Sequence, residues 1–323
     1  MARQRNDPDR KFMILLVGVT GAGKTTFASL ASGKDLAIGH GLDPCTQDPL
    51  AVEFTLNGHS VILIDTPGFD DDSRNDVEIL NDVAKWMVVK GLLRSQPLDG
   101  LILLHPVTRD FVSVMERRRT QLLEKLLGED AYTRVTIATT MWGSLDHGHA
   151  KRLDAEYNAV IDGSDRLGNN GVWANFRKRG ATVVKHENNK ESAQRILQNI
   201  IRKSIDEGTL QTLLQKEMGD RGVGFMDSSL GQHIVASLED DIRHLEQDLL
   251  NHRQECPPMG SRWAIHSTSY RRWKDWEAER NDLQKRLERR EAQLARLNGF
   301  VTWAEQIGKF WAARKQVLSR LWG

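Results

Sequence analysis

The sequence feature that most constrains the fold is the stretch GVTGAGKTT at residues 18–26. It directly follows the apolar run FMILLV and leads into TTFASLAS, which has a helix-forming composition. A strand, a glycine-rich turn and a helix in this order form a cradle for an anion, because glycines let backbone N–H groups point inward and the helix adds its positive end. The spacing GxxxxGK[ST] is met in full, so we predict a phosphate-binding loop that takes a nucleotide.

Individual side chains of this loop have separate chemical roles. Lys24 is expected to neutralise the β- and γ-phosphates, and Thr25 to offer a hydroxyl to Mg²⁺, which prefers hard oxygen ligands. The loop residues expected to contact the nucleotide are Gly18, Thr20, Gly21, Ala22, Gly23, Lys24, Thr25 and Thr26.

Further apolar runs predict a mostly parallel sheet covered by helices. Two runs, 51–56 and 60–65, flank Asn57-Gly58, a dipeptide typical of a tight hairpin turn. Later strand-like runs lie at 100–107, 134–142 and 181–186, separated by helical patterns at 76–91, 110–127, 146–162 and 190–206. This alternation predicts an α/β P-loop NTPase domain over residues 11–205.

A second motif, Asp65-Thr66-Pro67-Gly68, comes at the end of the third predicted strand. There the Asp65 carboxylate can reach the Mg²⁺ held by Thr25, and Gly68 can offer its N–H to a γ-phosphate. Thr46 lies between the two motifs, in a loop long enough to fold over the nucleotide and to sense both Mg²⁺ and the γ-phosphate.

Together these motifs resemble the GTPases of the translation-factor-related (TRAFAC) class. Within that class, DTPGFDDD, LILLHPVTRDF and HENNKESA resemble the immunity-associated (GIMAP-type) GTPases, the septins and the chloroplast outer-envelope import receptors, and TTMW is similar to little-characterised fungal proteins with such G domains. The resemblance covers roughly residues 11–205. It implies a G domain that binds GTP or GDP with Mg²⁺, with Thr140, Trp142, Asn188 and Asn189 near the base.

The chain departs from this family at two functional positions. Gly143 stands where the base-reading aspartate is expected, and Trp142 beside it is expected either to stack on the base or to belong to the core. Phe69 follows the switch glycine, where a water-orienting glutamine stands in Ras-like enzymes. The resemblance offers Arg109 as a replacement, an arginine entering a partner's site from a nucleotide-dependent dimer.

Beyond residue 206 the strand signals stop, and residues 206–323 are expected to form a helical module. Helices over 228–252 and 268–298 are predicted to pair as a hairpin, in which acidic residues of the first compensate Arg280 and Arg290 on the seam of the second. Residues 299–323 are expected to form an amphipathic C-terminal helix. It combines an aromatic stripe with basic residues, which suits docking on a protein, self-association or an interfacial membrane position.

Composition narrows the functional class. The formal net charge is +1, and although fourteen Lys and Arg face seven Asp and Glu from Arg262 onward, the two signs interleave, so we expect no nucleic-acid partner. Two distant cysteines and a polar N-terminus favour a cytoplasmic protein, with a peripheral membrane position as an extension.

The resulting interpretation is a Mg²⁺-dependent GTP-binding protein and slow GTPase switch that works as a homodimer. Two alternatives remain open at this point. One is an ATP-binding switch or ATPase, suggested by Gly143. The other is a non-hydrolysing scaffold whose nucleotide is structural and whose tail binds its partner, suggested by Phe69.

Overall fold

A computed structural model describes residues 10–36, 50–66, 98–107, 114–142, 174–209, 211–257 and 268–321. The chain divides into two compact units, Met1–Val223 and Gly224–Gly323. This division lies downstream of residue 205, where the sequence suggests a domain boundary.

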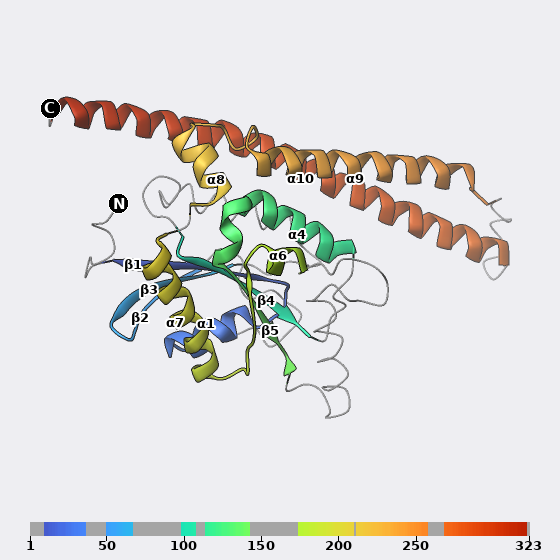
Figure 1. Cartoon of the computed structure of the whole chain (residues 1–323). Coiled ribbons are helices and arrows are strands. Elements are labelled where there is room, and N and C mark those ends of the chain that lie inside the picture. Colours follow the sequence, from blue (N-terminus) through green and yellow to red (C-terminus); the bar gives the residue numbers. More distant parts are fainter. Residues whose placement is uncertain are drawn as a thin grey trace. The chain divides into compact units, whose positions relative to one another are not determined.

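The first unit is built on a six-stranded sheet in the order β2-β3-β1-β4-β5-β6 (Figure 1). Only the β2–β3 pair is antiparallel among these strands; the other neighbouring pairs are parallel. The strands are β1 (Lys11–Gly18), β2 (Leu50–Leu56), β3 (His59–Asp65), β4 (Gly100–Pro106), β5 (Val135–Thr140) and β6 (Thr182–Lys185). Each corresponds to an apolar run of the sequence, so the predicted mostly parallel α/β sheet is confirmed.

Helices cover both faces of this sheet. Figure 1 shows α4 and α6 on one face and α1 and α7 on the other. The helices are α1 (Lys24–Ser32), α4 (Val114–Leu127), α6 (Ala174–Lys178), α7 (Lys190–Glu207) and α8 (Leu213–Gln215), with a 3₁₀ turn η2 (Glu129–Arg134) and a π turn η4 (Lys216–Asp220). The predicted helix at 190–206 is confirmed by α7, whereas the helices expected at 76–91 and 146–162 lie outside the described residues.

Strand β1 forms the centre of the core. Its side chains from Phe12 to Val17 are all buried, with Ile14, Leu16 and Val17 at 0% exposure. A parallel strand with helices on both faces is expected to be apolar throughout rather than alternating, because neither face meets water. The run FMILLV therefore has the composition that a central strand needs.

The β2–β3 hairpin turns at the predicted dipeptide. Asn57 has φ 49° and Gly58 φ 82°, so both central residues are in the left-handed region, as a two-residue turn of type I′ requires. The turn therefore confirms the hairpin read from the sequence.

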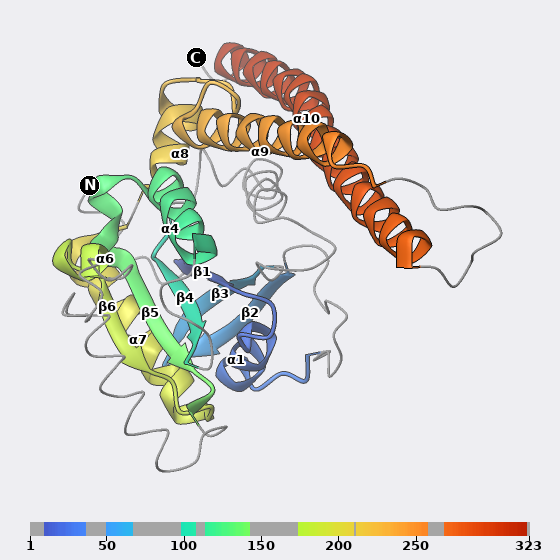
Figure 2. The same cartoon turned by 90° about the vertical axis from the view of Figure 1, so that its right-hand side faces the viewer.

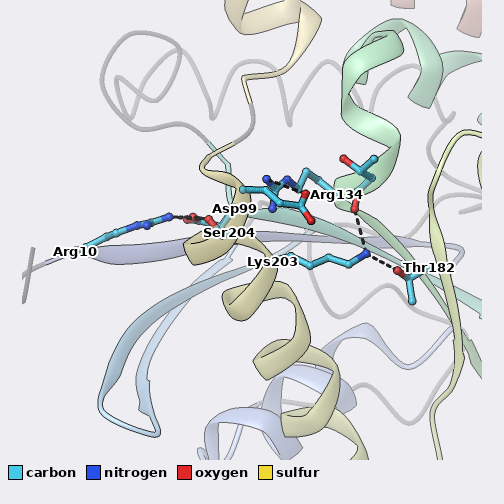
Figure 3. Close-up of polar contacts among 8 residues, drawn as sticks. Arg10, Asp99, Arg134, Thr182, Lys203 and Ser204 are labelled. Carbon is cyan, nitrogen blue, oxygen red and sulfur yellow. Dashed lines mark hydrogen bonds and ion pairs between the residues drawn. The ribbon is translucent and has the colours of Figure 1, made fainter. Parts of the chain in front are cut away.

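A polar network lies at the end of the sheet where strands β1 and β4 begin (Figure 3). The Asp99 carboxylate accepts hydrogen bonds from the Met13 N–H (2.7 Å) and from Arg10 (2.5 Å). It also accepts one from the hydroxyl of Ser204, near the end of α7. Asp99 is only 2% exposed, and these donors compensate its buried charge.

The second unit is a helical hairpin of α9 (Ser229–Gln254) and α10 (Thr268–Leu321), which lie side by side (Figure 2). Trp276 stacks on His252 with ring centroids 5.1 Å apart, and its indole N–H donates to the His252 carbonyl oxygen (2.8 Å). Arg290 lies 3.3 Å from Asp241. Trp276 contacts His252, whereas Arg290, later on α10, contacts Asp241, earlier on α9. The two helices are therefore antiparallel, as predicted.

Two details of the hairpin differ from the sequence prediction. Arg290 has the acidic partner expected on the first helix, but Arg280 is exposed and lies over the Trp276 ring, 5.4 Å from its centroid. An exposed guanidinium keeps its hydration and needs no buried carboxylate. The second helix also continues without a break to Leu321, so the segment beyond residue 298 is part of α10 and not a separate amphipathic helix.

Within the described residues, no helix is both long and apolar enough to cross a lipid bilayer.

Candidate functional site

The loop between β1 and α1 has the geometry of an anion cradle. A Cβ on Gly18 would lie 2.6 Å from the Leu104 carbonyl oxygen of β4, so this close approach of two strands admits only glycine. Gly23 begins α1 at φ 88°, in the left-handed region, and Gly21 shares a positive φ. The glycines read from the sequence are thus required by the path of this loop.

Lys24 lies inside the loop it belongs to. Its side chain is 7% exposed, and Nζ donates to the carbonyl oxygens of Gly18 and Val19, both at 3.0 Å. Burial lowers the pKa of Lys24 to about 8, although the nearby Asp65 charge opposes the shift. A buried ammonium whose hydrogen bonds go to neutral carbonyls is a binding group for an anion.

Thr25 and Asp65 come together as predicted for a metal site. The Thr25 hydroxyl donates to Asp65 Oδ2 at 2.9 Å, joining the first turn of α1 to the last residue of β3. Asp65 is fully buried. A hydroxyl and a carboxylate beside a phosphate cradle are hard oxygen donors, so these residues fit Mg²⁺.

Thr66 fixes the end of β3 next to this pair. Its hydroxyl donates to the Leu16 carbonyl oxygen at 2.8 Å, and the side chain is fully buried. The Asp65 carboxylate is therefore attached to a strand end that pairs with β1 on one side and with β2 on the other.

Three further loop residues were predicted to contact nucleotide. The Thr20 hydroxyl oxygen is buried and has no hydrogen-bond partner in the described part of the chain. The Ala22 N–H donates to the Val19 carbonyl oxygen (3.1 Å), while Thr26 is half-buried within α1. The Thr20 hydroxyl is thus suited to donate to a bound phosphate oxygen.

The end of β5 contacts the phosphate loop. The Thr140 hydroxyl donates to the Ala22 carbonyl oxygen at 3.0 Å. Met141 has φ 67°, which a side chain other than glycine adopts only at a cost, and its terminal methyl lies 4.0 Å from where a Cβ on Gly23 would be. The sequence marked Thr140 but not Met141, because a backbone conformation of this kind leaves no pattern in side-chain types.

Trp142 is held against its own strand and beside β6. Its indole N–H donates to the Thr139 carbonyl (3.3 Å) and hydroxyl (3.1 Å), and the Lys185 ammonium lies 4.1 Å from the ring centroid. One face of the indole is therefore taken by a cation. The side chain is half-buried, so it is neither in the core nor fully open to solvent.

The loop after β6 contains both predicted base-contacting asparagines. Asn188 is exposed and has φ 55°, whereas the Asn189 side-chain oxygen accepts from the Ser192 N–H (2.8 Å) and so caps α7. His186 is buried against Phe27 of α1, with ring centroids 5.0 Å apart. Burial lowers the pKa of His186 to about 4.

Several predicted site residues lie outside the described residues, namely Thr46, Gly68, Phe69, Arg109 and Gly143. Their roles stay predictions.

Comparison with known proteins points to one protein class. Residues 13–140, well under half of the chain, match the family model described as 50S ribosome-binding GTPase. GTPase Der of Burkholderia multivorans is 32% identical over 105 residues, which are 32% of this chain and 23% of that protein. GTP-binding protein A of Dictyostelium discoideum is 39% identical over 72 residues, 20% of this chain and 16% of that protein. The chain thus spans less than a quarter of these relatives.

Among solved structures, Toc33 from Arabidopsis thaliana in complex with GDP and Mg²⁺ is similar at a TM-score of 0.49 and 16% identity, over 64% of this chain and 88% of that chain. The G domain of FeoB from Methanococcus jannaschii is similar at a TM-score of 0.35 and 15% identity, over 61% of this chain and 99% of that chain. The phosphate loop, the mostly parallel sheet and the family match together show that the first unit contains a P-loop GTPase domain, a G domain.

Proposed function

We propose that this chain is a Mg²⁺-dependent GTP-binding protein that works as a slow GTPase switch. The observation that carries the proposal is Lys24, a buried ammonium whose two hydrogen bonds go to the carbonyls of Gly18 and Val19. Among the described residues no carboxylate forms a salt bridge with Lys24, although the Asp65 charge lies nearby. Burying such a cation costs free energy, and a bound phosphate would offset that cost. The neighbouring pair Thr25–Asp65 supports the same reading.

Thr25 and Asp65 are the residues we propose for Mg²⁺, with Thr46 joining them when the nucleotide is a triphosphate. The ion would neutralise charge on the phosphates of the bound nucleotide. The Thr20 hydroxyl and the amides of the loop, including that of Gly21, would donate to phosphate oxygens.

For the base, we propose guanine. The supporting residues lie at the ends of β5 and β6, where Thr140 contacts the phosphate loop and Asn188 is exposed on the neighbouring loop. Trp142 lies at the same end of the sheet, with the Lys185 ammonium 4.1 Å from its ring centroid. Within the GTPases, the segments quoted above favour a place near the immunity-associated and septin-related G domains.

The primary experiment identifies the nucleotide that copurifies with the full chain and measures the affinities for GDP and ADP by competition with a fluorescent GDP. Lys24→Ala is expected to weaken GDP binding by at least about 100-fold, because it removes a charge-assisted contact from a desolvated site. Lys34→Ala, at an exposed lysine just beyond α1, is the matched control and should change nothing. A higher affinity for ADP than for GDP would replace the guanine assignment by the ATP-binding alternative.

Hydrolysis is proposed to depend on a homodimer formed through the nucleotide face, with Arg109 acting in trans and Gly68 contacting the γ-phosphate. The turnover rate per chain should then rise with protein concentration, and Arg109→Ala should remove that rise, because an arginine finger contributes about 10³–10⁵ in rate. Arg202→Ala, an exposed arginine on α7, is the control. A single-turnover assay without any product would favour the non-hydrolysing scaffold.

For residues 299–323 we propose docking on a protein surface or on a second copy, in a cytoplasmic setting. Truncation before Gly299 should then reduce the oligomer size measured by light scattering. If it abolished flotation with anionic vesicles and left oligomer size unchanged, the segment would instead be a peripheral membrane anchor.

A further inference from the structure

His186 lies where three elements of the first unit meet. The His186 backbone N–H donates to the Thr139 carbonyl oxygen near the end of β5 (2.8 Å), and the imidazole ring packs edge-on against Phe27 of α1. Its Nδ1 lies 2.5 Å from the hydroxyl oxygen of Ser192, in the first turn of α7. Both His186 and Ser192 are buried, at 3% and 0% exposure.

Ser192 makes two hydrogen bonds through its hydroxyl group. The hydroxyl oxygen accepts from the Glu187 N–H at 2.9 Å, and it shares a second hydrogen bond with His186 Nδ1, in which the histidine tautomer sets the donor. The lowered pKa of His186 agrees with a ring that stays neutral at physiological pH.

Ser192 fastens both ends of the short loop Glu187–Asn189. Its hydroxyl binds the Glu187 N–H at one end, and its own N–H donates to the Asn189 side-chain oxygen at the other (2.8 Å). Between them Asn188 has φ 55°, in the left-handed region where asparagine is enriched among residues other than glycine.

These contacts connect the loop to the helix that follows the phosphate cradle. Phe27 belongs to α1, which starts at Lys24, and the Gln194 side chain of α7 donates to the Ala31 carbonyl oxygen of α1 (3.1 Å). The loop that contains Asn188 is therefore held, through these contacts, at a fixed position relative to α1, the helix that would bind the phosphates.

We propose that Ser192 and His186 are positioning residues that hold the loop Glu187–Asn189 in place to read the base of the bound nucleotide. They set base selectivity without touching the base. This inference rests on the proposed function, since it presupposes a nucleotide in the cradle.

The test compares the GDP-to-ADP affinity ratio of the full chain and its variants. Ser192→Ala is expected to lower this ratio about 10-fold, the effect of losing one hydrogen bond to a buried group. Ser204→Ala is the matched control, because this serine is also fully buried on α7 but donates to Asp99 at the opposite edge of the sheet. It should leave the ratio unchanged even where the protein becomes less stable.

Conservative variants separate positioning from general packing. His186→Asn keeps a hydrogen-bonding partner for the Ser192 hydroxyl and should retain more of the GDP-to-ADP affinity ratio than His186→Leu. Hydrogen exchange at the Glu187 amide, measured without nucleotide, should speed up in Ser192→Ala and not in Ser204→Ala, which gives a readout even if binding is weak.

The outcomes separate this inference from the function on which it rests. If the wild-type chain binds neither nucleotide, the proposed function fails and takes this inference with it. If the wild type prefers GDP but Ser192→Ala lowers both affinities equally, or leaves Glu187 exchange unchanged, the positioning role is wrong while nucleotide binding stands. A wild type that binds GDP and ADP equally would also overturn it.

Discussion

At the scale of single residues, the site combines buried groups whose ionisation burial opposes. Lys24 is a cation that desolvation pushes toward neutrality, and His186 is a base that burial keeps neutral. Both shifts have measurable consequences, because a pKa that differs between two states of a protein couples those states to pH.

Phosphate binding should be coupled to proton uptake by Lys24. With a pKa of about 8, about half of the lysines are neutral at pH 8, and a bound polyphosphate favours the charged form. Calorimetry in buffers of different ionisation heat should therefore show uptake that grows from pH 7.5 to pH 8.5, reaching about half a proton at pH 8. Uptake that is absent throughout this range would contradict the lowered pKa.

His186 should make the protein less stable in mild acid. Its pKa is about 4 in the fold, set mainly by burial, with Glu187 opposing the shift and Arg195 adding to it, against 6.5 for an ordinary histidine. Between these values the unfolded chain binds the proton and the folded chain does not, so stability falls as pH drops through 6.5 and levels off below 4. From pH 7 to pH 5 this amounts to roughly 2 kcal/mol.

Urea denaturation of wild type and His186→Asn at both pH values checks this sign. The asparagine variant should lose less stability on acidification than the wild type, by about the same amount. An equal loss in both proteins would mean that His186 is protonated in the fold.

At the scale of elements, the sequence predicted the strands and turns whose formation depends on nearby residues. The six strands follow from apolar runs, and the hairpin turn follows from Asn57-Gly58, whose positive φ values the backbone confirms. The continuity of α10 did not follow, because the glycines at 299 and 308 interrupt the pattern and suggested two helices where the structure has one to Leu321. A single glycine costs a helix only about 1 kcal/mol, so it does not by itself end one.

The α9–α10 hairpin should depend on Trp276. Its ring stacks on His252 and its N–H donates to the His252 carbonyl, so Trp276→Ala removes both contacts. We expect a loss of about 2 kcal/mol in the stability of the second unit, less than for a fully buried tryptophan. Thermal denaturation followed by circular dichroism measures it, and unchanged GDP affinity is the control.

The candidate site likewise contains contacts that the sequence predicts and contacts that it does not. Lys24, Thr25 and Asp65 were predicted because short motifs at the ends of adjacent strands must meet. The hydrogen bond between His186 and Ser192 was not predicted. It joins the residue after β6 to the first turn of α7 while the His186 ring packs against Phe27, and no spacing in the sequence encodes these contacts.

At the scale of the whole molecule, every described residue proposed for nucleotide or Mg²⁺ lies in the first unit, Met1–Val223. A fragment ending at Val223 should accordingly bind GDP within about threefold of the full chain, a difference of under 1 kcal/mol. Titration of both proteins against fluorescent GDP tests this. A large loss in the fragment would make the helical hairpin a contributor to the site.

Side-chain hydrogen bonds hold helix α7 near both of its ends. Ser192 fixes its start to the loop after β6, and Ser204 fixes its far end to Asp99 and Arg10, about 18 Å away along the helix axis. A helix bonded near both ends in this way is expected to resist tilting unless one of these sets of hydrogen bonds breaks. Movement that accompanies a change of nucleotide should therefore bypass α7, and the helix can serve as the fixed frame against which such movement is measured.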